Sequence, residues 1–142
     1  MLKYKFFISW IVCSTYMFLA FYAWHGWILN DIDRLAYPKD FFLLVSSCTY
    51  LGIGALMAFF VQILTVPERL PRRGWVVGIF AGVFIFSIAF VFGVSFNSSQ
   101  GVLHLLTDFC WQVLEQTSGG WLCGLTVSYL SYLQTHKEAA ES

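Results

Sequence analysis

The chain has 142 residues, of which 58% are hydrophobic and 20% aromatic, while only 11% are charged. An average soluble domain carries about 25% charged residues. Eight basic and eight acidic side chains are too few to cover a water-soluble globule of this size, so we expect a lipid bilayer to cover it. The formal net charge of zero and the lack of a basic stripe also exclude a nucleic-acid binder.

Four stretches are long and apolar enough to be predicted as transmembrane helices. A crossing needs roughly 20 apolar residues, because the hydrocarbon core is about 30 Å thick and a helix rises about 1.5 Å per residue. The predicted spans are residues 6–29, 41–64, 75–96 and 102–133, and prolines occur only in the connections. The fold class predicted for residues 1–142 is therefore all-α: a single polytopic membrane domain in which four transmembrane helices form an antiparallel bundle.

Basic residues at the N-terminus and in the connections predict the orientation. Lys3 and Lys5 precede the first span as they would in a secretory signal, but the apolar run is too long and residues 21–24 are aromatic where a cleavage site needs small residues. With the N-terminus in the cytoplasm, six of the eight basic residues lie on that side and only Arg34 and Lys39 on the other. Cytoplasmic loops are enriched in Lys and Arg. We therefore expect the first span to be retained and both termini to be cytoplasmic, in the inner membrane of a bacterium.

Small residues at four-residue spacing indicate where the spans pack against one another. Helices in a membrane associate through close van der Waals contact, which small residues permit. Glycines with this spacing lie in the third and fourth spans: Gly74, Gly78 and Gly82, and Gly120 and Gly124. They predict that these two spans, joined by a short turn, are antiparallel neighbours.

The fourth span carries a stripe of polar residues. His104, Asp108, Trp111 and Glu115 lie 4, 7 and 11 residues apart, which places them on one face of a helix, about 60° wide. An Asp near the middle of a bilayer costs about 2.5 to 3.5 kcal/mol, whereas each Leu or Phe returns only about 0.3 to 0.6. The stripe is therefore expected to point inward, against the other spans or a partner subunit. Glu115, which has no basic residue nearby in the sequence, is the best candidate for a group that is protonated or meets a cation, a substrate or another subunit.

Two histidines are predicted to lie at a similar depth near the outer side of the membrane. If the first and fourth helices touch, His25, His104 and Asp108 could converge on one outward-facing ligand site, which would suit a divalent metal or, through the histidines, a haem. The simpler interpretation is that both are interfacial histidines bonded to their neighbours. The four cysteines show no Cys-x-x-Cys spacing, so they are interpreted as small packing residues. No cofactor and no metal are predicted.

Two functions stay open on the sequence alone. Short connections, glycine grooves and aromatic surfaces favour a small non-catalytic subunit, or an assembly or stabilising factor, of a larger bacterial membrane complex, with other membrane subunits as partners. The alternative is a homo-oligomeric transporter or channel for protons or cations that uses Asp108 and Glu115, because intramembrane carboxylates mark ion pathways. An enzyme is not predicted, since no hydrolase spacing and no phosphate loop occur.

Overall fold

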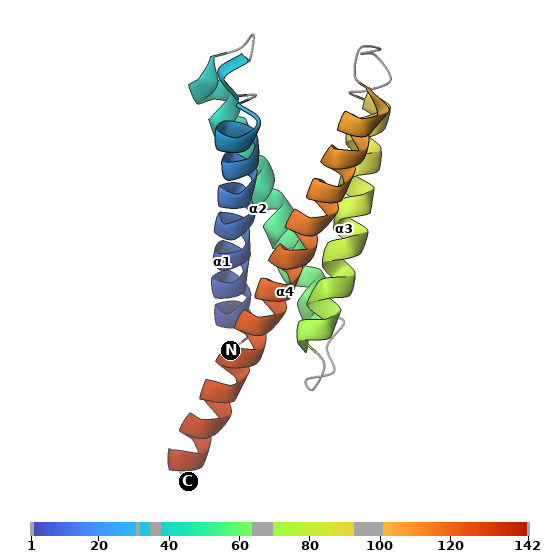
Figure 1. Cartoon of the computed structure of the whole chain (residues 1–142). Coiled ribbons are helices and arrows are strands. Elements are labelled where there is room, and N and C mark those ends of the chain that lie inside the picture. Colours follow the sequence, from blue (N-terminus) through green and yellow to red (C-terminus); the bar gives the residue numbers. More distant parts are fainter. Residues whose placement is uncertain (1, 31, 35–37, 64–69, 93–100, 142) are drawn as a thin grey trace.

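The computed structural model is all-helical, and it describes residues 2–30, 32–34, 38–63, 70–92 and 101–141. In chain order the elements are α1 (Leu2–Tyr22), the short η1 (Ala23–Ile28) and η2 (Ile32–Arg34), α2 (Lys39–Ile63), α3 (Leu70–Phe92) and α4 (Val102–Glu141). Successive long helices run in opposite directions (Figure 1). The predicted all-α class is confirmed. The ends of the second and third predicted spans, at 64 and 93–96, and the turn at 97–100 lie outside the described residues.

The first helix ends in a π-helical turn. Over Ala23–Ile28 the backbone turns are wider than in an α-helix, and the Leu29 N–H donates to the Trp24 carbonyl oxygen at 2.9 Å. The chain leaves the helix at Asn30, whose φ of 55° lies in the left-handed region that asparagine adopts more readily than most residues. Single π turns within helices often occur at functional sites, which directs attention to this end of the bundle.

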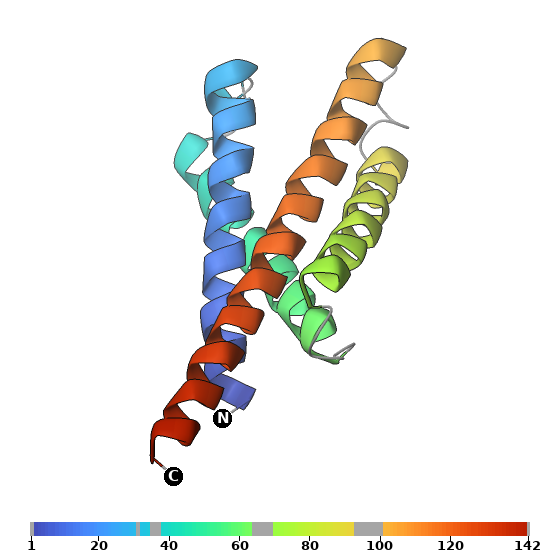
Figure 2. The same ribbon diagram turned by 60° about the horizontal axis from the view of Figure 1, so that its bottom comes forward.

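The fourth helix continues about two turns beyond the predicted span, which ends at residue 133. Gln134 Nε2 donates to Glu138 Oε1 at 3.0 Å, and the segment from 134 to 141 has no proline or glycine to interrupt the helix. At about 1.5 Å per residue, the 40 residues of α4 extend about 60 Å, roughly twice the thickness of the hydrocarbon core. The C-terminal part of α4 therefore projects past the first turn of α1, as Figures 1 and 2 both show.

The most extensive contact in the fold is between α3 and α4, which lie side by side in both views (Figures 1 and 2). Gly74 faces the backbone of Gly120, and Gly78 faces the backbone of Gln116. A Cβ atom added to Gly82 would lie 2.8 Å from the Cα atom of Val113. The glycine face of α3 therefore lets the two backbones approach more closely than any larger side chain would allow.

The first helix packs between α2 and α4. Gly54 of α2 lies against the side chain of Ser14, and Gly119 of α4 lies against that of Met17; Gly124 is buried in the same helix. The core that results is formed by Cys13, Met17, Tyr50, Met57, Ala58, Val61, Cys123 and Val127. Two of the four thiols are thus packing residues in the core, whereas Cys48 and Cys110 are exposed on the outer faces of their helices.

Three helices of the described chain are long and apolar enough to cross a membrane. They are Tyr4–Ile28, Lys39–Ile63 and Arg72–Val91, close to the first three predicted spans. Many large apolar side chains point outward from them, among them Phe7, Leu56 and Phe80, which a lipid environment accommodates. α4 has the length for a crossing, but its polar residues make it less apolar than the other three.

Charged side chains separate to the two ends of the bundle. Of the described basic side chains, Lys5 of α1, Arg72 and Arg73 of α3 and Lys137 of α4 lie toward the end that contains the N-terminus (Figure 1). Lys39 lies at the other end and forms an ion pair with Asp33. The hydrogen bond from Lys39 holds the pKa of the exposed Asp33 carboxyl below its usual range, so this carboxylate stays ionised at neutral pH.

Candidate functional site

The polar stripe of α4 begins at a histidine–aspartate pair that solvent partly reaches. His104 Nε2 and Asp108 Oδ2 are 3.7 Å apart, and the two side chains are 45% and 30% exposed. Both residues belong to the first two turns of α4, which α1 does not cover because the two helices diverge toward this end (Figure 1). The second carboxylate oxygen of Asp108 is buried and has no hydrogen-bond partner among the described residues. The stripe therefore leads from water-accessible groups toward the interior.

One turn further along, an aromatic stack joins α4 to the end of the first helix. The rings of Trp111 and Trp24 lie with centroids 4.2 Å apart and planes only 8° apart. Trp24 belongs to the π-helical turn. Stacked aromatic pairs contribute about 0.5–1.5 kcal/mol beyond their buried area, so this pair holds the two helices together where their axes separate. It also lies between the partly exposed His104–Asp108 pair and the deeper part of the stripe.

Glu115 lies below this stack, enclosed by the chain's own helices. It is only 3% exposed. The Gln116 amide donates to its carboxyl oxygen at 3.1 Å, and the Tyr50 hydroxyl of α2 is a second hydrogen-bonding partner. The Trp111 indole N–H also faces the carboxyl, without reaching hydrogen-bond geometry. The sequence predicted that the stripe packs either against the other spans or against a partner subunit. In the structure Glu115 faces α2 of the same chain.

Buried donor and acceptor atoms without a hydrogen-bond partner lie near Glu115 on α4. Among the described residues, Gln112 Nε2 and Gln116 Oε1 are buried without a hydrogen-bond partner. Gln116 is completely buried. Buried polar atoms are nearly always paired, and an unpaired one costs about 1–3 kcal/mol. Unpaired polar atoms beside a buried carboxyl lower the stability of this segment. Such a loss of stability is typical of functional sites.

Polar groups continue from this centre toward the other end of the bundle. The thiols of Cys13 and Cys123 contact each other across the α1–α4 interface, and Ser9 contacts Cys123. Gln62 of α2 donates to Ser9 Oγ at 3.5 Å. At the end of this series, Lys5 Nζ donates to Ser131 Oγ at 3.0 Å. The interior of the bundle thus carries polar side chains at intervals from one end to the other.

The histidine site predicted at the outer end is not assembled as a metal site. The His25 ring lies against Phe21, with centroids 5.0 Å apart, whereas His104 is next to Asp108. In the part of the chain that the structure describes, no three His, Cys, Asp or Glu side chains form a group that could hold a metal ion. Haem at His25 and His104 stays the less favoured option that the sequence left open, beside the prediction of no cofactor.

Two residues of the site carried no recognisable signal in the sequence. Tyr50 lies in an otherwise apolar stretch of the second span, and Trp24 sits among aromatic residues near the end of the first. Tyrosines and tryptophans in such places are commonly membrane-interface residues. Only the packing of α2 and η1 against α4 shows that Tyr50 reaches Glu115 and that Trp24 stacks on Trp111.

No protein-family model, curated protein or solved structure matches this chain, so its function has to be inferred from the geometry of the molecule. In chemical terms the site is a carboxyl group with a phenol, an amide and an indole around it. These groups can hold, accept or release a proton, or bind a small cation, at a buried position next to the Trp24–Trp111 stack.

The pairing of Glu115 with Tyr50 predicts how stability responds to substitution. Tyr50→Phe removes one donor from a buried carboxyl and should lower the free energy of unfolding by about 1–3 kcal/mol. Tyr50→Phe/Glu115→Leu removes the buried carboxyl together with its tyrosine donor, and replacing both members of such a pair is close to neutral. The cost that remains comes from the Gln116 amide, which loses its acceptor. Thermal unfolding in detergent, followed by tryptophan fluorescence, measures both.

A double variant at least as stable as the parent would mean that Glu115 is kept for a purpose other than stability. A double variant less stable than Tyr50→Phe alone would contradict this and make Glu115 a structural residue.

Proposed function

We propose that all four helices cross the membrane, with both termini in the cytoplasm of a bacterial cell. This is supported by the way α4 distributes its polarity: Glu115, Gln116 and Thr117 are buried, while outward positions include Leu106 and Leu114. The grouping of described basic side chains at the end that contains both termini supports the orientation, since Lys and Arg are enriched on the cytoplasmic side.

The orientation has a direct test. A single cysteine in place of Lys137, in a variant whose exposed Cys48 and Cys110 are changed to serine, should react with a membrane-impermeant maleimide only after the cytoplasmic side is opened. A cysteine in place of His104 should react in intact cells. Reversed accessibility would contradict the proposed orientation.

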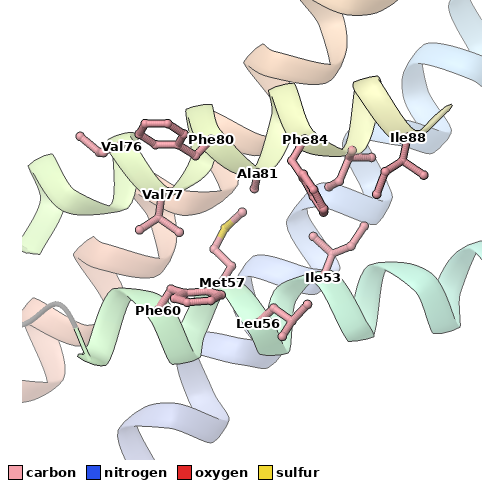
Figure 3. Close-up of a pocket in the computed structure, with 11 residues that line it drawn as sticks. Ile53, Leu56, Met57, Phe60, Val76, Val77, Phe80, Ala81, Phe84 and Ile88 are labelled. Carbon is pink, nitrogen blue, oxygen red and sulfur yellow. The ribbon is translucent and has the colours of Figure 1, made fainter. Parts of the chain in front are cut away.

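We further propose that the chain is a non-catalytic subunit that docks in a larger membrane complex. The observation that carries this proposal is an apolar groove between α2 and α3 (Figure 3). The groove has a volume of about 640 Å³ and only apolar side chains line it, from Ile53, Leu56, Met57 and Phe60 of α2 and from the stretch between Val76 and Ile88 of α3. α2 and α3 are consecutive helices, yet they make little contact with each other.

The shape of the groove suits a helix. Along α3 it extends over the thirteen residues from Val76 to Ile88, about 18 Å or more than three turns. The small Ala81 lies at its floor beside Met57, while Phe80 and Phe84 form one wall and Phe60 part of the other (Figure 3). Membrane helices pack where small residues between larger ones admit a ridge of neighbouring side chains. We assign the groove to a transmembrane helix of a different subunit.

Loss of the groove wall should therefore release the partner. Phe80→Ala/Phe84→Ala removes two exposed rings, so it should leave the fold intact and lower the fraction of chain found in a heterogeneous complex at least tenfold, because central aromatic contacts contribute most to docking. Phe7→Ala/Phe59→Ala removes two rings that are also exposed and do not line the groove, and serves as the matched control. Native mass spectrometry after gentle detergent extraction gives both fractions.

Three results would contradict the subunit proposal: a parent protein extracted only as a lone particle of 16.2 kDa, a parent found only as a ring of identical copies, or equal losses in the two double variants.

The buried carboxyl supports a second candidate function, transport of protons or cations along α4 in a homo-oligomer. The supporting observation is the position of Glu115, enclosed at 3% exposure yet followed outward by Asp108 and His104 on the same helix. Intramembrane carboxylates of this kind commonly lie on ion pathways.

The second candidate predicts ion flux through proteoliposomes that depends on Glu115. Glu115→Gln removes the ionisable group with little change in shape and should abolish the flux, whereas Glu138→Gln, at an exposed position of the same helix, should leave it unchanged. A pH-sensitive dye trapped in the vesicles measures proton flux. Absence of flux with the parent protein, together with intact heterogeneous complexes, would exclude transport and favour the subunit.

A further inference from the structure

A second groove lies at the opposite end of the bundle from His104. It is formed where the first turns of α1 meet the C-terminal part of α4, and it has a volume of about 520 Å³. Its lining residues are Tyr4 and Lys5 of α1 and Leu130, Leu133, Gln134 and Lys137 of α4. Unlike the groove between α2 and α3, it combines two ammonium groups with apolar side chains.

The positions of the polar groups are fixed by contacts on both helices. Lys5 Nζ donates to Ser131 Oγ at 3.0 Å, which holds the ammonium group against α4. Gln134 Nε2 donates to Glu138 Oε1 at 3.0 Å, which holds that carboxylate beside the groove. Lys5 and Lys137 both line the groove, and among the described side chains Glu138 is an acidic group held next to it. Two ammonium groups on facing helices make the groove suited to an anion.

The apolar part of the lining identifies the kind of anion. The apolar span of the first helix begins at Tyr4, so the groove lies at the boundary between the hydrocarbon and the polar surface. Leu130 and Leu133 give it an apolar wall on the same side as the lysines. A free phosphate ion would make no favourable contact with these leucines. A phospholipid places its phosphate at the boundary and an acyl chain along the apolar surface.

We propose that this groove binds the phosphodiester of an anionic phospholipid. Lys5 and Lys137 contact the phosphate, the Tyr4 ring and the two leucines contact the upper part of an acyl chain, and Gln134 is within the groove as a further polar group. The lipid fills the angle between α1 and α4 and so fixes the helix pair at the membrane surface. The site is independent of the partner assigned to the α2–α3 groove.

The site can be tested with the full-length chain in detergent, titrated with dioleoyl phosphatidylglycerol and followed by native mass spectrometry. The parent protein should retain one phosphatidylglycerol more tightly than any phosphatidylcholine. Removal of each ammonium should weaken binding by roughly fivefold, the effect typical of one lysine at an anionic membrane surface, so Lys5→Gln/Lys137→Gln should lose about 25-fold. Lys5→Arg/Lys137→Arg keeps both charges and should retain the lipid.

Two controls decide the assignment. Lys39→Gln changes a lysine at the other end of the bundle and should bind as the parent does; an equal loss in this variant would show that binding follows net charge and would overturn the site. Millimolar inorganic phosphate should not displace the lipid, and displacement would assign the groove to a free anion. Equal binding of phosphatidylcholine, or unchanged binding by Lys5→Gln/Lys137→Gln, would also overturn the proposal.

Discussion

The structure depends on how the polar side chains of α4 are sheltered by three apolar helices. Glu115 and Gln116 would oppose insertion of an isolated helix, because each polar group in hydrocarbon must find its partner within the protein. The bundle provides this through backbone contact: Gly78 of α3 lies directly on the backbone at Gln116, and α1 and α2 enclose the other face, with Tyr50 reaching the carboxyl of Glu115. Close packing and polar burial are thus two aspects of one arrangement.

The sequence predicts the elements of this fold well, because spans of membrane length and glycine spacing are properties of single segments. The repeated spacing of Gly74, Gly78 and Gly82 indicates a side-chain-free face, and in the structure that face lies on α4. α4 continues beyond the predicted span of 102–133, because the span is defined by the apolar run and the helix is not. The backbone remains helical through residue 141, since polar residues such as Gln134 and Lys137 are also good helix formers.

The sequence predicts only the residues of the site that share one face of α4. The spacing of His104, Asp108 and Glu115 follows from helical geometry, but Tyr50 and Trp24 join them through contacts between helices. Such contacts depend on rotation about each helix axis, which single-segment patterns leave open. The same limit explains His25: the residue lies within the π-helical turn and its ring packs on Phe21, an arrangement that its depth in the sequence pattern could not indicate.

The uninterrupted backbone of α4 has a mechanical consequence. Its backbone contact with Gly74 of α3, at Gly120, lies near the middle of its 40 residues, so that roughly 27 Å of helix extends to one end and about 31 Å to the other. Such a helix acts as a lever about that point. A change of tilt imposed on its C-terminal tail would therefore reappear, with opposite sign, at the other tip of the helix, where His104 and Asp108 are located.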